Sequence, residues 1–181
     1  MDLNGSRVLV TGADGFIGSH LAERLVRQGA SVRAFVMYNL TSSRGWLDES
    51  DPSLIDSMEV VPGDLRDSEQ VADAVRGCDV VFHLAALISV PYSYQAPRSF
   101  VDTNVGGTLN VLEGARRHGG VKVVQTSSSE VYGTPSQVPI RESHPLQAQS
   151  PYAASKIAAD ALADSYHRSY DLPAVILRPF N

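Results

Sequence analysis

Short apolar runs alternate with longer amphipathic stretches along the chain, and this alternation is the strongest constraint on its fold. Six runs have the length and the Val, Leu, Ile or Phe content of strands: residues 7–11, 31–37, 58–62, 80–84, 121–127 and 174–178. Four stretches between them have the character of helices: residues 16–28, 68–76, 98–118 and 152–170. Because the apolar runs are continuous, we expect strands covered on both faces. The sequence therefore predicts an α/β fold with a doubly wound parallel sheet.

Composition limits the class of protein. The 181 residues, 43% of them hydrophobic, suffice for one globular domain, so we assign residues 1–181 to a single unit. A net charge of −5 with scattered Lys and Arg argues against a nucleic-acid partner. The longest apolar run, residues 80–90, is too short to cross a bilayer, and no metal-ligand spacing is present. A single cysteine, Cys78, and the lack of a leader-like N-terminus predict a cytoplasmic protein.

A glycine-rich turn follows the first expected strand and opens the first expected helix. Residues 11–18 read TGADGFIG, with the spacing G-x-x-G-x-x-G. Glycines at this place permit a tight turn, close approach of a pyrophosphate to the backbone and close packing of the helix. The sequence therefore predicts a Rossmann-like domain that binds a dinucleotide at the helix N-terminus. The turn residues expected to contact the dinucleotide are Gly12, Asp14, Gly15, Phe16, Ile17 and Gly18.

The end of the second expected strand bears on the choice between NAD and NADP. An acidic residue there holds the ribose 2′-hydroxyl of NAD, but this strand ends Val36-Met37-Tyr38-Asn39. No carboxylate at the strand end would repel a 2′-phosphate, and no Arg stands beside it to attract one, because Arg44 lies further into the loop. We expect NAD and leave NADP open. Asp64 is placed to meet the adenine end, or to serve as a turn residue.

A tyrosine and a lysine lie one turn apart at the start of the last expected helix. Tyr152 and Lys156, in the sequence SPYAASK, share a helix face. A nearby ammonium favours a phenolate, so we expect Lys156 to lower the pKa of Tyr152 from about 10 towards neutrality. A phenolate of that pKa can act as a general base for an alcohol. A pair of this kind also occurs by accident on helix surfaces, so its meaning depends on the other motifs.

Together the motifs resemble the extended short-chain dehydrogenase/reductases, the NAD-dependent epimerase/dehydratase family. The glycine turn, the run His83-Leu84-Ala85-Ala86, Asn104, the serines of residues 127–129 and Y-x-x-x-K follow in the expected order over nearly the whole chain. Within that superfamily the sequence is similar to nucleotide-sugar epimerases and dehydratases. The resemblance implies oxidation of a sugar at C4 by a bound nicotinamide cofactor, with Tyr152 as base, Lys156 on the nicotinamide ribose and Ser128 bonded to the 4-oxygen.

The resemblance also implies further binding residues. Cofactor contacts are expected from Tyr38, Asn39, Asp64, Leu65, Leu84, Ala85, Ala86, Tyr152 and Lys156. Substrate contacts are expected from Ser89, Ser93, Ser128 and Asn181. His83 is expected to pack near the cofactor, and Trp46 to anchor its loop or to touch a ligand.

Glu130 indicates chemistry beyond epimerisation. In QTSSSEVYG, residues 125–133, the two positions after Ser128 are Ser129 and Glu130, whereas simple 4-epimerases typically lack an acid there. The resemblance implies that Glu130 removes the C5 proton once C4 is a ketone, that the C6 hydroxyl leaves as water, and that the hydride returns to C6. The implied enzyme is a nucleotide-sugar 4,6-dehydratase, with Ser128, Ser129, Glu130, Tyr152 and Lys156 as its catalytic residues.

The same residues leave alternatives open. The dTDP-glucose 4,6-dehydratases usually have Asp where this chain has Ser129, so either Glu130 carries the proton to the C6 oxygen or Ser129 relays it. Ser-Ser-Glu is similar to GDP-mannose 4,6-dehydratases and also to UDP-glucuronate decarboxylases. Other stretches resemble UDP-N-acetylglucosamine 4,6-dehydratases of the legionaminic-acid type: residues 32–39, 44–48, 83–88 and 91–94. We favour that substrate, with a 4-epimerase, a decarboxylase or a non-catalytic NAD(P)-binding module as alternatives.

Three expectations concern the rest of the chain. Residues 39–57 have no clear period and predict a loop with room for one helical turn, and Asp67 with Gln70 forms a plausible capping pair. By resemblance, the helices of residues 98–118 and 152–170 pair into a four-helix bundle of a homodimer, through apolar positions such as Leu109, Leu112, Ala158 and Leu162. Because Asn181 follows the last expected strand so closely, we expect a truncated chain without most of a smaller C-terminal substrate domain.

Overall fold

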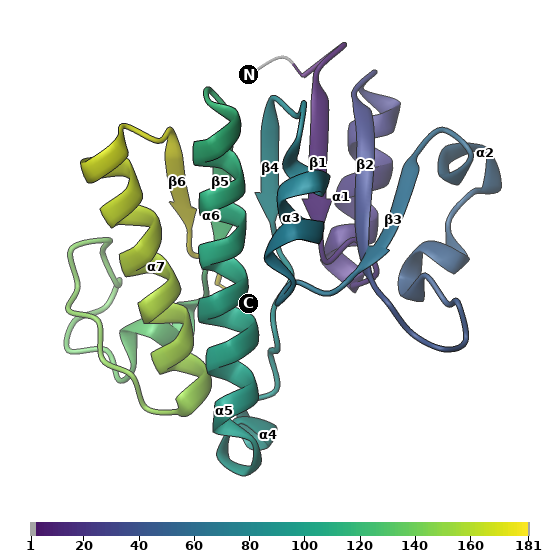
Figure 1. Cartoon of the computed structure of the whole chain (residues 1–181). Helices are drawn as coiled ribbons and strands as arrows, with labels where there is room; N and C mark the ends of the chain where they lie inside the picture. Colours follow the sequence, from purple (N-terminus) through teal and green to yellow (C-terminus); the bar gives the residue numbers. More distant parts are fainter. Residues whose placement is uncertain (1–2, 181) are drawn as a thin grey trace.

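The computed structural model describes residues 3–180, which form one sheet flanked by helices (Figure 1). Its strands are β1 (Arg7–Thr11), β2 (Ser31–Met37), β3 (Glu59–Gly63), β4 (Val80–His83), β5 (Lys122–Thr126) and β6 (Ala174–Leu177). They are hydrogen-bonded in the order β3-β2-β1-β4-β5-β6, and every pair is parallel. The doubly wound parallel sheet is confirmed, and its order reverses between β1 and β4, where ligands bind in such sheets.

Helices cover the two faces of the sheet unequally. The longer ones are α1 (Phe16–Arg27), α3 (Ser68–Val75), α6 (Gly107–His118) and α7 (Pro151–Tyr170). Figure 1 shows α3, α6 and α7 on one face and α1 on the other. A core therefore forms on each face, one around Leu9, Val81 and Leu112 and the other around Val10 and Leu25.

Short helices fill the segments that the sequence left least defined. Residues 39–57 hold a 3-10 helix, η1 (Gly45–Glu49), and one α-helical turn, α2 (Pro52–Ile55). The helix expected over residues 98–118 is divided into α5 (Pro97–Phe100), a π-helical segment η2 (Val101–Gly106) and α6, after a separate α4 (Val90–Gln95). The division is centred on buried Asn104, whose side chain bonds to a neighbouring loop; π segments of this kind are frequent at functional sites.

Strand β6 departs from the expectation that both faces of each strand are covered. Val175 and Leu177 are 54% and 53% exposed on the face opposite α7, whereas the residues of β1 from Val8 onward are buried. Leu112 also lies in the core of the chain itself, so of the expected dimer positions it is unavailable to a partner, while Leu109 is 38% exposed. The apolar pattern alone does not distinguish a strand at the edge of the sheet from a central strand.

Within residues 3–180, no helix has the length and apolarity to cross a membrane, and no group of three His, Cys, Asp or Glu side chains could hold a metal ion. The cytoplasmic location and the absence of a nucleic-acid partner stay predictions.

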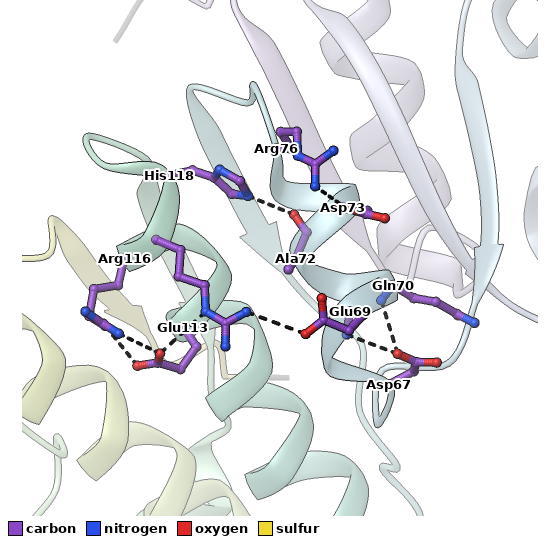
Figure 2. A network of polar contacts seen from close by, with 10 residues as sticks. Asp67, Glu69, Gln70, Ala72, Asp73, Arg76, Glu113, Arg116 and His118 are labelled. Carbon is purple, nitrogen blue, oxygen red and sulfur yellow. Dashed lines mark hydrogen bonds and ion pairs between the residues drawn. The ribbon is translucent and has the colours of Figure 1, made fainter.

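The capping pair of α3 is half confirmed (Figure 2). Asp67 Oδ1 accepts hydrogen bonds from the backbone N–H groups of Glu69 and Gln70, at 3.0 and 3.1 Å. Gln70 does not return the bond to Asp67; its Oε1 accepts from Asp64 N at 3.1 Å and so fixes the turn after β3. The N-terminus of α3 therefore depends on one carboxylate.

We expect Asp67→Ala to lower the free energy of unfolding by about 1 kcal/mol, because the substitution removes the acceptor of two otherwise unpaired N–H groups. Urea unfolding followed by circular dichroism measures the loss. Asp73→Ala on the same helix removes only an exposed ion pair with Arg76, whose loss costs a few tenths of a kcal/mol (Figure 2). Equal losses in the two variants would contradict the capping role.

Candidate functional site

The glycine turn is built for close backbone approach. Gly12 has φ of +71°, a left-handed conformation, and a Cβ there would lie 2.8 Å from Ala85 N and Cα in the loop after β4. A Cβ at Gly18 would overlap the carbonyl of Gly12, so the start of α1 could not pack on the turn with any other residue. These two glycines bring the turn, the loop after β4 and the N-terminus of α1 together.

The N-terminus of α1 is suited to a pyrophosphate. Its N-cap residue is Gly15, no side chain caps it, and the flanking Phe16 and Ile17 are 57% and 65% exposed. The first N–H groups of a helix attract an anion when no side chain occupies them. The turn thus fits the diphosphate of a dinucleotide, which agrees with the sequence prediction.

The segment after β2 has a different organisation from the one expected. Tyr38 is 63% exposed, but the Asn39 side chain shapes its own loop: its Oδ1 accepts from Thr41 N and Ser43 N, and its Nδ2 donates to Ser43 O at 2.7 Å. A cofactor contact from Asn39 stays a prediction, and its amide already has partners. The backbone N–H of Trp46 donates to Asp14 O at 2.9 Å and its ring packs against Phe16, while the side chain is 51% exposed, so the loop-anchor role and the ligand contact both stay predictions.

Asp64 and Leu65, at the expected adenine end, serve the turn after β3. Arg66 binds the Asp64 carboxylate through Nε and Nη2, and its hydrogen bonds hold the pKa of Asp64 below its usual value. Leu65 is buried against Gly107, and its carbonyl accepts from Asn110 Nδ2 at 3.0 Å. Both parts of the Asp64 prediction are compatible with this arrangement, while Leu65 has little surface left for a ligand.

Among the loops beside the site, the segment after β4 is pinned to β1. Leu84 N and Ala85 N donate to Thr11 O and Thr11 Oγ1, both at 3.2 Å, and Leu84, Ala85 and Ala86 are half-buried next to the glycine turn. These three residues therefore lie beside the turn that is expected to hold the cofactor. Their cofactor contact stays a prediction at the level of single residues.

The expected substrate residues differ in accessibility. Ser89 is exposed and accepts from Tyr92 N as the N-cap of α4. Ser93 is completely buried and donates to Val90 O at 2.6 Å, which argues against the substrate contact implied by the resemblance. The Ser93 hydroxyl donates its proton within its own helix, α4, instead. Asn181 lies outside the described residues.

The residues expected to be catalytic converge at the carboxyl end of β5. Ser128 begins the 3-10 helix η3 (Ser129–Tyr132) by accepting from Glu130 N at 3.2 Å. Its side chain hydrogen-bonds the phenol of Tyr152, and the carboxylate of exposed Glu130 is close enough to affect the pKa of that phenol. Ser129 is half-buried beside them, with its N–H donating to Pro179 O at 3.2 Å. Ser128, Glu130 and Tyr152 thus form one group although 22 positions separate the last two in the sequence.

The pKa of Tyr152 is raised, contrary to the prediction from its spacing to Lys156. Burial has the largest effect, the Glu130 carboxylate raises the pKa further, and the hydrogen bond from Ser128 lowers it. Lys156 Nζ donates to Thr126 O at 2.6 Å, and burial lowers the pKa of Lys156 itself to about 8. Helical spacing predicted the correct face for both side chains but not the cost of burying a phenolate.

Asp160 is a site residue that sequence reasoning missed. It lies one turn beyond Lys156, is 2% exposed, and accepts from Ser127 Oγ at 2.8 Å and from Arg178 Nε at 3.0 Å. Its charge favours the protonated form of Lys156. The spacing Y-x-x-x-K-x-x-x-D, which continues one helix face, was the signal that could have indicated it.

Buried hydrogen bonds of His83 connect the segments that form the site. His83 Nδ1 lies 2.7 Å from Thr11 Oγ1, and His83 Nε2 lies 3.1 Å from Thr108 Oγ1. Thr108 donates its hydroxyl proton to Asn104 O at 2.6 Å, so it accepts from Nε2–H, and Nδ1 accepts from Thr11. The imidazole is neutral in this arrangement, and burial lowers the pKa of His83 to about 3. The expectation that His83 packs near the cofactor site rather than reacting agrees with its place in this network.

Comparison with known proteins agrees with this geometry. Residues 9–181 match the family model described as GDP-mannose 4,6 dehydratase. The chain belongs to this family. Its fold and motifs are those of the NAD-dependent epimerase/dehydratase group of short-chain dehydrogenase/reductases, so the resemblance stated from the sequence is confirmed at that level.

The relatives of this GDP-mannose 4,6-dehydratase family member include 4-epimerases and 4,6-dehydratases. Over 97% of its length the chain is 40% identical to a UDP-glucose 4-epimerase of Mycolicibacterium smegmatis, of which it covers 56%. Over 97% of its length it is also 37% identical to a dTDP-glucose 4,6-dehydratase of Streptomyces niveus, of which it covers 53%. The crystal structure of the dTDP-glucose 4,6-dehydratase DesIV from Streptomyces venezuelae, with NAD bound, matches with a TM-score of 0.85 at 38% identity, over 95% of this chain and 55% of DesIV. The chain spans about half the length of the curated relatives it matches.

We expect the stability of this family member to fall between pH 7 and pH 5 because of His83. The folded state holds the imidazole neutral, whereas the unfolded chain takes up a proton below pH 6.5, so stability is lost as the pH falls through that value. Lowering the pH from 6.5 to 5 should cost roughly 2 kcal/mol from this residue. Urea unfolding at both pH values measures it.

His83→Gln should remove most of that pH dependence, even if the variant is less stable at pH 7. The matched control is His20→Gln, which replaces an exposed histidine and should leave the wild-type slope unchanged. An unchanged slope in His83→Gln would contradict the buried neutral imidazole.

Proposed function

We propose that this chain carries the NAD-binding and catalytic side chains of a nucleotide-sugar 4,6-dehydratase, with UDP-N-acetylglucosamine as the substrate. The observation that carries the proposal is Glu130, a carboxylate beside the Ser128–Tyr152 pair at the end of β5. A 4-epimerase needs only reversible oxidation at C4. A second proton-transfer group at that place supports loss of water.

In the proposed reaction each residue has one task. Ser128 holds the 4-oxygen and Tyr152 takes its proton, while Lys156 binds the nicotinamide ribose. Glu130 then removes the C5 proton, which the adjacent C4 ketone has acidified, and passes it to the C6 hydroxyl, which leaves as water. NAD, which the turn of Gly12 to Gly18 would hold, supplies reversible hydride transfer. Ser129 orients the departing hydroxyl, because a serine hydroxyl is too weak an acid to donate the proton itself.

Two other activities have specific support. The 4-epimerase activity is supported by the Mycolicibacterium smegmatis relative, whose sequence identity to this chain is slightly higher than that of the Streptomyces niveus dehydratase. A UDP-glucuronate decarboxylase activity is supported by residues 128–130, whose Ser-Ser-Glu pattern resembles that of such decarboxylases. A non-catalytic NAD-binding module is the remaining alternative, and the convergence of Ser128, Tyr152 and Lys156 weighs against it, since binding alone needs no such group.

Isotope labelling separates these reactions. The protein that carries this chain, with any sequence that follows residue 181, is incubated with UDP-N-acetylglucosamine in heavy water, and the product is analysed by mass spectrometry and NMR. A dehydratase loses water, takes up solvent deuterium at C5 and moves the C4 hydrogen to C6. An epimerase returns the hydrogen to C4 with no loss of water, and UDP-glucuronate tests the decarboxylase. Bound NAD without any turnover would support the non-catalytic module.

We expect Glu130→Gln to slow the loss of water by about 100-fold or more, because it removes the general base for C5. Oxidation at C4 should persist, so the substrate should still reduce bound NAD, which NADH absorbance reports. Glu142→Gln alters another exposed carboxylate, in the following loop, and should leave the rate unchanged. Equal rates of water loss in wild type and Glu130→Gln would contradict the assigned base.

A homodimer through α6 and α7 is proposed with this function. Leu109 on α6 is 38% exposed, and Ala158 and Leu162 on α7 are half-buried, so apolar side chains remain on the outer faces of both helices. Helix α6 is tied to α3 at its other end, where Arg117 lies 3.7 Å from Glu69. A second copy packed on α6 and α7 would cover the apolar positions.

Leu109→Glu should weaken dimerisation at least about tenfold, because it would bury a charge in the interface. Sedimentation equilibrium measures the dissociation constant. Leu40→Glu makes the same change at a position that is 93% exposed in the loop after β2, and should leave the constant unchanged. A wild-type chain that stays monomeric would contradict the proposal.

A further inference from the structure

The glycine turn carries a carboxylate that the end of β2 lacks. Asp14 Oδ2 accepts a hydrogen bond from the N–H of Met37, the last residue of β2, at 3.3 Å. In NAD-binding Rossmann domains an acidic residue at the end of this strand holds the ribose 2′-hydroxyl. In this chain the strand end itself continues with Tyr38 and Asn39. The carboxylate that reaches the end of β2 belongs to the glycine turn instead.

The position of Asp14 is fixed by its neighbours. Its carbonyl accepts from Trp46 N at 2.9 Å, so η1 holds the backbone of the turn. Gly45 has φ of +59°, and a Cβ there would collide with the Asp14 carbonyl, which requires glycine at the contact. The bonds from Trp46 and Met37 constrain the backbone and the carboxylate together. Asp14 is therefore preorganised rather than a mobile surface charge.

Nearby basic side chains are already paired. Arg44 Nε lies 2.9 Å from Asp48 Oδ1, and Arg44 N donates to Asp48 Oδ2 at 2.8 Å. Arg66 is paired with Asp64 at the turn after β3. Over residues 3–180, no ion pair involves Asp14. The end of β2 thus has a carboxylate without a neutralising cation.

We propose that Asp14 determines the preference for NAD over NADP, by accepting a hydrogen bond from the adenosine ribose and repelling a 2′-phosphate. This rests on the proposed function only in that the chain binds a nicotinamide dinucleotide. A carboxylate and a phosphate dianion at one place repel strongly, whereas a ribose hydroxyl donates a charge-assisted hydrogen bond to the carboxylate. The expectation from the sequence, that no carboxylate would oppose NADP, considered only the strand end.

Equilibrium binding of NADH and NADPH, measured by fluorescence titration, tests the proposal without any substrate. The wild-type chain should bind NADH at least about 100-fold more tightly than NADPH. Asp14→Asn keeps an acceptor for Met37 N and removes the charge, so it should reduce this ratio at least about tenfold, mainly by improving NADPH binding. Asp14→Ser combined with Tyr38→Arg, which adds a cation at the strand end, should reduce the ratio further.

Controls separate the role of Asp14 from general effects. Asp73→Asn makes the same change in net charge at an exposed position of α3 and should leave the ratio unchanged. Circular dichroism and thermal unfolding confirm that each variant is folded. Wild-type binding of NADPH as tight as NADH, or an unchanged ratio in both Asp14 variants, would overturn the role of Asp14 and leave the dehydratase proposal intact. A folded chain that binds neither dinucleotide would overturn the cofactor site and both proposals.

Discussion

The neutral imidazole of His83 joins the parts on which the site depends. It receives a hydrogen bond from Thr11 at the end of β1 and donates one to Thr108 in α6, and Thr11 in turn receives Ala85 N. Because a buried polar group without a partner costs roughly 1–3 kcal/mol, each link of this chain stabilises the position of the next. The glycine turn and the loop after β4 are consequently held against each other at the switch point of the sheet.

The same network continues to α7. Asn104 binds Leu87 through both its oxygen and its nitrogen, and its Nδ2 also donates to Ser155 Oγ at 2.9 Å. Ser155 donates to the carbonyl of Tyr152, so the side chains of Asn104 and Ser155 tie the first turn of α7 to the loop after β4. Further along α7, Lys156 and Asp160 are both buried, and each lowers the cost of the other's charge. Asp160 Oδ1 is one of two buried side-chain polar atoms without a hydrogen bond in residues 3–180.

Much of the fold could be predicted because local signals were strong and mutually consistent. All six strands were located within two residues, since each is an apolar run bounded by turn residues. The division of the helix of residues 98–118 could not be predicted, because it is centred on Asn104, whose partners Leu87 and Ser155 lie 17 and 51 positions away in the sequence. The candidate site was predicted by motif, but the roles of Asn39 in its own loop and of Asp160 beside Lys156 depend on contacts between segments.

The sequence by itself determined the order of strands and helices along the chain, the glycine turn and the residues of the candidate site, because spacing and side-chain chemistry are local properties. Only the tertiary structure decided the electrostatics. Burial raises the pKa of Tyr152 and lowers that of Lys156, opposing the effect expected from their spacing alone. The tertiary structure also brings Asp14 to the end of β2, 23 positions away. The sequence of that strand end contains no acid, so it could not decide between NAD and NADP. Desolvation and contacts between distant segments are set by the packed fold, and no local pattern encodes them.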